Sequence, residues 1–303
     1  MTTGLLIGLD IGATKILGVA VEPDGRLVAQ ARTPTPNGGD AVVAAAAGVV
    51  DKLRAETGSR PAHAVGVGVP GLVDTARGTL QNAVNLGVNE DWFPLGAALS
   101  ERIDAAVVVD NDANAAALGV ARRTGHDDLA YLSIGTGLAA ALVLGGRIRR
   151  GLRGAAGEIG HIPIDPAGPR CPCGQVGCLE TFASGSAVAA AWPSDQAPPA
   201  QALFDAADAG AAAAVLVRDT FAARVADAVR LVALSVDPAA VVLGGGVAHV
   251  GERLLVAVRS ALTAQAAESP FLTSLDLAGR LSLMPLDTPV AALGAAILGE
   301  EGR

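Results

Sequence analysis

The chain has 303 residues, of which 51% are hydrophobic and 17% are charged, a balance that is typical of globular proteins and excludes intrinsic disorder. Its formal net charge of −8 argues against nucleic-acid binding, and no apolar run approaches the roughly 18 residues that span a membrane. The composition therefore predicts a soluble, cytoplasmic protein that contacts neither nucleic acid nor membrane and is long enough for two domains.

The first half predicts strands that alternate with helices, the pattern of an α/β fold. Three strands joined as hairpins are expected over residues 5–9, 16–21 and 26–31. We expect Asp40 to cap an alanine-rich helix that ends near Gly58. Two buried strands follow, over residues 64–69 and 105–109.

The second half repeats the opening pattern. Leu9–Gly12 matches Leu132–Gly135 at an offset of 132 − 9 = 123 residues. Chance likeness between two hairpins is one explanation; duplication, the better one, predicts two related α/β domains with a cleft between them, where ligands favour binding. We assign residues 1–112 plus 287–303 to the smaller domain and 113–286 to the larger. Later elements are a helix over 211–236, a strand over 240–243, a helix opened by glycines 244–246 and running to about 267, and a helix over 289–298 that packs onto the first domain.

Three glycine-containing turns are candidate phosphate sites. Glycine lets backbone approach a phosphate closely, hydroxyls and lysine can bind it, and a carboxylate can hold Mg²⁺. An ordinary hairpin turn or tight turn remains the alternative for each. The candidate residues are Asp10, Gly12, Thr14 and Lys15 in the first turn, Gly135, Thr136 and Gly137 in its repeat, and Gly245 and Gly246 in the third.

Asn111 and Asp112 follow the strand that ends near Val109. An aspartate at this position is either a helix N-cap or a general base that accepts a hydroxyl proton. In a cleft closed by two phosphate turns, the second role predicts phosphoryl transfer to an alcohol, with Asn111 orienting the same ligand.

All three cysteines lie within eight residues, and a histidine precedes them by ten. Three thiolates and one imidazole make a complete tetrahedral zinc set, although a disulfide with one free thiol is an alternative. We expect the ligands to be His161, Cys171, Cys173 and Cys178. Glu158 and Glu180 border the set without being needed by the metal, so we expect both to point toward one polyol ligand.

In this order and spacing, the motifs resemble those of the ROK family of sugar kinases and repressors, and are most similar to its bacterial zinc-containing glucokinases. The most specific part runs from Cys171 to Glu180, preceded by Glu158–His161. The resemblance implies an actin-like, ribonuclease H-like ATPase fold, with ATP and Mg²⁺ as cofactors, a structural Zn²⁺, and a homodimer or homotetramer. It makes Asp112 the catalytic base. The sugar ligands that it implies are Asn85, Asn111, Asp112, Glu158, His161 and Glu180.

The leading hypothesis is ATP-dependent phosphorylation of a hexose, with glucose as the first candidate and glucose 6-phosphate as its product. Kinases for N-acetylmannosamine, N-acetylglucosamine or fructose are alternatives, as is a non-catalytic sugar sensor or repressor. Polyphosphate is an alternative donor, supported only by the basic patch of Arg147, Arg149, Arg150 and Arg153. The chain departs from the family pattern at Ala13, at Val120 and after Gly137, where alanines stand in place of glycines.

Overall fold

The computed structural model describes residues 4–301 except 59, 61, 90 and 196–197, and it divides into two compact units. The first consists of residues 1–125, 146–154 and 287–303, and the second of residues 126–145 and 155–286. The division differs from the sequence-based one because the helix that begins at Asp112 belongs to the first unit. Its alanines pack against the C-terminal helix, which the sequence correctly placed on this unit.

The elements of the first unit alternate as expected. Its strands are β1 (Leu5–Ile11), β2 (Lys15–Val21), β3 (Leu27–Pro34), β4 (Ala62–Val69), β5 (Leu72–Asp74), β6 (Thr79–Gln81) and β7 (Ala106–Asn111). Its residues 146–154 also contain β10 (Arg147–Ile148), which is the edge strand of the other five-stranded sheet. Its helices are α1 (Gly39–Glu56), the 3₁₀ turn η1 (Val84–Leu86), α2 (Leu95–Ile103), α3 (Asp112–Thr124) and α9 (Val290–Glu301).

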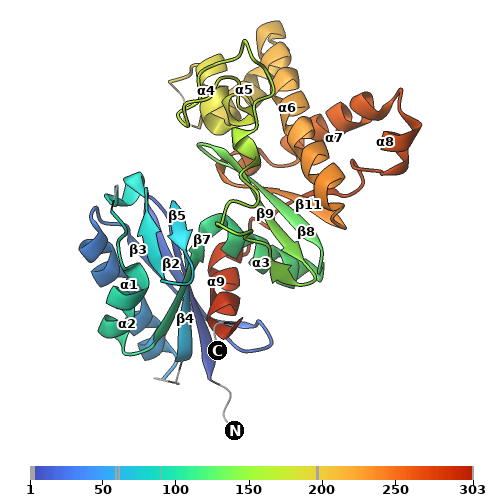
Figure 1. Cartoon of the computed structure of the whole chain (residues 1–303). Coiled ribbons are helices and arrows are strands. Elements are labelled where there is room, and N and C mark those ends of the chain that lie inside the picture. The colour runs from blue at the N-terminus through green and yellow to red at the C-terminus, as the bar shows by residue number, and fades with distance from the viewer. Residues whose placement is uncertain (1–3, 59, 61, 90, 196–197, 302–303) are drawn as a thin grey trace. The chain divides into compact units, whose positions relative to one another are not determined.

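The first unit is a sheet covered on both faces. Its strand order is β3-β2-β1-β4-β7, with β1–β3 antiparallel and β4 and β7 parallel to β1. Side chains alternate along a strand. Ile7 and Leu9 of β1 therefore join the core beneath α1 and α2, while Leu6 packs on the other side with α9. Figure 1 shows the two pairs of helices, α1 with α2 and α3 with α9, on opposite faces of this sheet.

Glycines let α9 approach the sheet at backbone distance. A Cβ added at Gly8 of β1 would lie 2.0 Å from the carbonyl oxygen of Ala292, and one at Gly66 of β4 would lie 1.6 Å from that of Ala295. Because no side chain fits at these two glycines, the C-terminal helix packs directly on the backbones of β1 and β4.

The second unit has the same strand arrangement. Its strands are β8 (Leu129–Ile134), β9 (Leu138–Leu144), β11 (Ala240–Gly244) and β12 (Leu281–Leu283). Its helices are α4 (Gly185–Ala191), α5 (Pro199–Asp208), α6 (Ala212–Val236), α7 (Glu252–Ala266) and α8 (Pro270–Ser274), with 3₁₀ turns η2 (Ile159–His161), η3 (Leu179–Thr181) and η4 (Gly246–Val250). β8 pairs with β9 antiparallel and with β11 parallel, as β1 pairs with β2 and β4.

The repeated hairpins differ by one residue. Ile11 pairs with Ile16 and leaves four residues between them, whereas Ile134 pairs with Leu138 and leaves three. The second turn is therefore tighter. The duplication predicted from the sequence is confirmed, and the fold is the predicted actin-like, ribonuclease H-like α/β fold.

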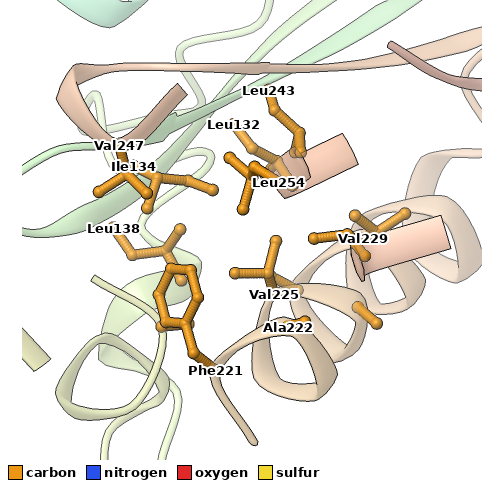
Figure 2. Packing of buried hydrophobic residues seen from close by; sticks show 14 of the residues in the cluster. Leu132, Ile134, Leu138, Phe221, Ala222, Val225, Val229, Leu243, Val247 and Leu254 are labelled. Carbon is orange, nitrogen blue, oxygen red and sulfur yellow. The ribbon is translucent and has the colours of Figure 1, made fainter. Parts of the chain in front are cut away.

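The core of the second unit lies between its sheet and two helices. Figure 2 shows Leu132 and Ile134 of β8 facing α6, which presents Phe221, Val225 and Val229 at a spacing of four residues. That spacing places the three side chains on one helix face. Every one of these side chains is buried.

Two local predictions are wrong. The N-cap of α1 is Gly38, with φ of 100° and no side-chain cap, so Asp40 lies in the first turn instead of capping it. Gly244–Gly246 does not open α7: the five-residue turn η4 intervenes, and α7 begins at Glu252 after its own N-cap, Gly251. In the described part of the chain, none of the helices combines the length and apolar character needed to cross a membrane.

Candidate active site

Asn111 and Asp112 lie where β7 passes into α3. Asn111 is the N-cap: its Oδ1 accepts a hydrogen bond from Ala113 N at 2.9 Å, while its Nδ2 donates to the carbonyl oxygen of Gly71 at 3.2 Å. Asp112 is the first residue of α3, and its Oδ1 also accepts from Ala113 N, at 2.8 Å. The N-cap alternative for Asp112 is therefore wrong, because its neighbour performs that role.

Burial raises the pKa of both carboxyl groups in this region. The pKa of Asp112 lies above its ordinary value of 3.8 because the group is desolvated, although the hydrogen bond from Ala113 N opposes the rise. The pKa of Asp10, at the end of β1, is raised to about 6 by burial and then by the charge of Asp112, with Lys15 lowering it. The charge of Asp112 contributes to the raised pKa of Asp10, so the two carboxylates interact electrostatically.

A glycine on β4 makes the carboxylate region possible. Gly68 pairs with Asp10 on one side and Asp110 on the other. A Cβ at Gly68 would lie 2.9 Å from the Cβ of Ala115 and 3.5 Å from the Cα of Asp112. Any side chain there would therefore push α3 away from the sheet.

Sequence reasoning missed the ion pair beneath Asn111. Asp110 is only 1% exposed, and its Oδ2 accepts a hydrogen bond from Arg150 Nε at 2.7 Å. Its Oδ1 accepts from Asn111 N at 2.7 Å and from Asn114 Nδ2 at 2.8 Å. Asp110 thus fixes the end of β7. The only sequence signal was an aspartate at the last position of an apolar strand.

The remaining candidates of the first unit are at its surface. Gly12 N donates to the carbonyl oxygen of Lys15 at 3.0 Å, which closes the β1–β2 turn. Thr14 and Lys15 are exposed at this turn, as a phosphate-binding role requires. Asn85 is exposed on η1, whose last turn ends at the left-handed Gly87.

In the second unit, the ligand atoms of His161, Cys171, Cys173 and Cys178 all lie within 4.8 Å of one another. The Sγ atoms of Cys173 and Cys178 are 3.7 Å apart, and Cys171 Sγ lies 3.8 Å from His161 Nδ1. Zn–S bonds of about 2.3 Å in a tetrahedron put neighbouring sulfurs about 3.8 Å apart, so the cluster fits zinc. A disulfide, at about 2.05 Å, does not fit, and all three thiols are free.

Gln175 supports this cluster and was not foreseen. Its Nε2 donates to the carbonyl oxygen of His161 at 2.9 Å and contacts Cys173 Sγ at 3.4 Å. Hydrogen bonds from Gln175 lower the pKa of Cys173, whereas burial raises the pKa of Cys171 and that of Cys178.

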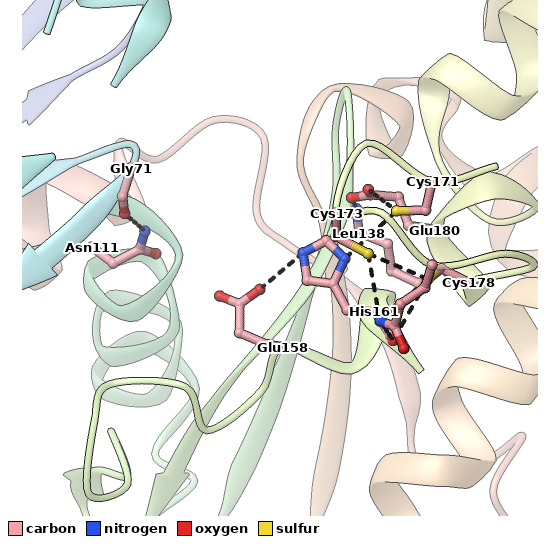
Figure 3. Close-up of polar contacts among 10 residues, drawn as sticks. Gly71, Asn111, Leu138, Glu158, His161, Cys171, Cys173, Cys178 and Glu180 are labelled. Atoms are coloured by element: carbon pink, nitrogen blue, oxygen red, sulfur yellow. Dashed lines mark hydrogen bonds and ion pairs between the residues drawn. The ribbon is translucent and has the colours of Figure 1, made fainter. Parts of the chain in front are cut away.

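The two carboxylates beside the cluster have different surroundings. Glu158 Oε2 lies 3.8 Å from His161 Nε2, the ring nitrogen that faces away from the cysteines. Glu180 Oε2 instead accepts a hydrogen bond from Leu138 N at 3.0 Å, and Oε1 lies 3.8 Å from Cys171 Sγ. Figure 3 shows Glu158 and Glu180 on either side of the His161 ring.

The glycine turns of the second unit lie together. Gly135 O accepts a hydrogen bond from Gly185 N, at the start of α4, at 2.7 Å. A Cβ on Gly245 would lie 2.6 Å from the carbonyl oxygen of Ile134, and Gly245 has a φ of 77°. Tyr131 Oη accepts from Gly245 N at 3.2 Å. The β8–β9 turn, which carries Thr136 and Gly137, and the Gly245–Gly246 turn are therefore neighbours.

Comparison with known proteins matches residues 6–301 to the ROK family. The chain is 40% identical over 193 residues to a glucokinase of Streptomyces coelicolor, covering 61% of this chain and 58% of that protein. The chain thus spans little more than half the length of this relative. It is 32% identical over 284 residues to a glucokinase of Halalkalibacterium halodurans, covering 86% of each. An N-acetylmannosamine kinase of Yersinia pseudotuberculosis is 34% identical over 246 residues, covering 80% of this chain and 82% of that protein.

Two solved structures share the fold over nearly the whole chain. A ROK hexokinase from Thermus thermophilus has a TM-score of 0.82 and 35% identity, with 98% of each chain covered. A ROK family glucokinase from Streptomyces griseus, in complex with glucose and AMPPNP, has a TM-score of 0.75 and 32% identity, with 99% of this chain and 100% of that chain covered. With its duplicated fold, its Cys₃His cluster and these matches, the chain belongs to the ROK family.

Proposed function

We propose that the protein is a sugar kinase that transfers the γ-phosphoryl group of ATP to a hexose, with glucose as the preferred candidate. The observation that carries this proposal is the Asp112 carboxyl group at the start of α3, desolvated and with a raised pKa. Glucokinases among its ROK relatives, including one solved with glucose and AMPPNP, support the choice of sugar and donor.

Asp112 acts as the general base. Its Oδ1 is held by Ala113 N, so Oδ2 is the oxygen that we assign to the proton of the attacking hydroxyl. A pKa above the ordinary carboxyl value strengthens Asp112 as a base. Asn111, fixed by its two hydrogen bonds, orients the hydroxyl beside it.

Sugar recognition is assigned to Asn85, Asn111, Asp112, Glu158, His161 and Glu180. Glu158 supplies an acceptor and His161 a donor for sugar hydroxyls, because an imidazole that binds metal through Nδ1 carries its proton on Nε2, the nitrogen that lies 3.8 Å from Glu158 Oε2. Hydroxyls that leave water must each find a partner, so a dense set of polar groups suits a polyol.

Phosphate binding is assigned to the three glycine turns. Asp10, Gly12, Thr14 and Lys15 belong to the first, Gly135, Thr136 and Gly137 to the second, and Gly245 and Gly246 to the third. Mg²⁺ bound with ATP supplies neutralisation of phosphate charge. The carboxyl oxygens of Asp10 suit such a hard cation, and the mutual repulsion of Asp10 and Asp112 favours one nearby.

We assign a structural Zn²⁺ to His161, Cys171, Cys173 and Cys178. All four ligand positions are filled by protein, so the metal stabilises the fold of this segment without reacting. Bound there, a zinc ion would hold the His161 ring by the nitrogen beside Cys171, which leaves Nε2 for the sugar.

The test is a coupled assay of ADP release with a panel of hexoses and both ATP and polyphosphate as donors. We expect turnover with ATP and glucose. Asp112→Asn is expected to lose at least a thousandfold in kcat while still binding sugar, and Asp51→Asn, the same change at an exposed carboxylate of α1, to retain full activity. Sugar-independent ADP release alone, or an active Asp112→Asn variant, would refute the proposal.

A preference for N-acetylmannosamine over glucose is the second candidate, favoured by the similarity to the Yersinia kinase. The basic patch offers weaker support for a polyphosphate donor than its sequence suggests, because Arg150 is bound to Asp110 and the exposed arginines are 147, 149 and 153. A cytoplasmic location and assembly as a homodimer or homotetramer are further parts of the proposal. Size-exclusion chromatography with light scattering tests the assembly.

A further inference from the structure

We infer that Glu180 is a positioning residue that ties the zinc-binding segment to the β8–β9 turn, and that it supports nucleotide binding even when no sugar is present. This inference rests on the proposed phosphate role of that turn, and it adds to the sugar-binding role assigned to the same residue.

The zinc-binding segment, residues 161–178, fixes the backbone position of Glu180. Glu180 lies in η3, two residues after the ligand Cys178. Leu179 N donates to the carbonyl oxygen of Ile162 at 2.9 Å, and Thr181 Oγ1 donates to that of Cys178 at 2.7 Å. The residues on both sides of Glu180 are thus bonded to Ile162, which follows the candidate ligand His161, and to the candidate ligand Cys178.

The Glu180 carboxylate contacts the β8–β9 turn. Its Oε2 accepts a hydrogen bond from Leu138 N, the first amide of β9, at 3.0 Å. A Cβ on Gly137 would lie 2.2 Å from the same oxygen, so the carboxylate rests directly on the glycine of the turn. The other oxygen, Oε1, lies 3.8 Å from the zinc ligand Cys171. One side chain therefore contacts both the candidate metal site and the candidate phosphate site (Figure 3).

A third contact closes the arrangement. A Cβ on Gly160, the residue before the ligand His161, would lie 2.1 Å from the carbonyl oxygen of Leu138 and 3.3 Å from Glu180 Cβ. Leu138 is therefore held between the histidine-bearing turn and Glu180. A bond between an amide and a carboxylate is stronger than one between neutral groups, so its loss frees the start of β9 and the turn before it.

The decisive measurement is the affinity for AMPPNP with Mg²⁺ in the absence of sugar, by titration calorimetry on the zinc-loaded protein. A residue that only binds sugar cannot affect this value. We expect Glu180→Ala to weaken AMPPNP binding roughly tenfold, since a hydrogen bond to a charged group contributes about that much. Glu180→Gln, which retains an acceptor for Leu138 N, is expected to stay close to the wild type.

Glu158→Ala is the matched control. It removes the other carboxylate beside the zinc cluster, the one whose Oε2 lies 3.8 Å from His161 Nε2. We expect it to reduce sugar affinity and to leave AMPPNP affinity without sugar unchanged. Unchanged AMPPNP affinity in Glu180→Ala, or an equal loss in Glu158→Ala, would overturn the inference.

Hydrogen exchange, with zinc content measured on the same samples, separates this inference from the proposed function. In Glu180→Ala we expect at least tenfold faster exchange of the Leu138 amide, and no change there in Glu158→Ala. If the wild type binds no nucleotide, the proposed function fails and the exchange result still decides the positioning role. Unaltered exchange at Leu138 would overturn it.

Discussion

Replacing Asp10 by asparagine is expected to stabilise the fold at neutral pH and to leave it unchanged in acid. Burial raises the pKa of this carboxyl from 3.8 to about 6. Each pH unit between those values corresponds to 1.36 kcal/mol, so ionised Asp10 lowers the free energy of unfolding by roughly 3 kcal/mol above pH 7. Asparagine has nearly the same shape and carries no charge, so it removes this penalty.

The sign follows from proton binding. Between pH 4 and pH 6 the folded chain keeps a proton on Asp10 that the unfolded chain has released, so this group's contribution to stability falls as the pH rises. Below pH 4 both states are protonated and the group contributes little. The gain from Asp10→Asn is therefore expected at pH 8 and not at pH 4.

Urea unfolding followed by tryptophan fluorescence measures the effect. Trp92 lies in the first unit and Trp192 in the second, so Trp192→Phe leaves a single probe on the unit that contains Asp10. The buffer should lack Mg²⁺, because a bound cation would offset the penalty. Asp51→Asn, at an exposed position, is the control. Equal effects of Asp10→Asn at pH 4 and pH 8, or destabilisation at pH 8, would refute the reasoning.

Three further outcomes are expected. Burial raises the pKa of Asp112 above 3.8, so kcat/KM should fall as acid protonates this base, with the midpoint of the fall above pH 3.8. Rates measured from pH 4.5 to 8 test this, and Asp112→Glu should move the midpoint. Cys178→Ser should lower zinc content below one ion per chain and weaken sugar binding, by atomic absorption and calorimetry; normal sugar affinity without metal would contradict the structural role. Gly66→Ala would place a Cβ 1.6 Å from the Ala295 carbonyl oxygen and should lower the melting temperature by at least 10 °C. The control is Gly48→Ala in α1, where an added Cβ meets nothing within 4 Å, and it should raise stability by up to about 1 kcal/mol. Similar effects of the two changes would argue against close packing of α9.

The strands and the duplication were predictable because their signals are local. Continuous apolar runs at residues 64–69 and 105–109 became β4 and β7 with ends shifted by at most two residues. Helix starts were less predictable. Aspartate is a common N-cap residue, yet Gly38 and not Asp40 is the N-cap of α1, because the chain enters the helix with a positive φ. Glycines 244–246 were likewise expected to open a helix. The short turn η4 begins at Gly246 instead.

The zinc cluster was predictable from spacing, since its ligands are close in sequence and a metal's geometry is fixed. The role of Asn111 as the cap of α3 was not, because it depends on which of two adjacent polar residues leaves the helical conformation. The Asp110–Arg150 pair was not foreseen either, since it joins residues 40 positions apart.

The sequence by itself therefore determined the family, the duplicated α/β pattern and the Cys₃His cluster that could hold a metal, all of which follow from short-range residue patterns. Only the tertiary structure decided what the carboxylates contact. Glu158 and Glu180 look equivalent beside the cysteines, but one faces His161 and the other is bonded to Leu138. The physical reason is that burial and hydrogen-bond partners arise from segments distant in sequence, and these partners set the orientation of each carboxylate.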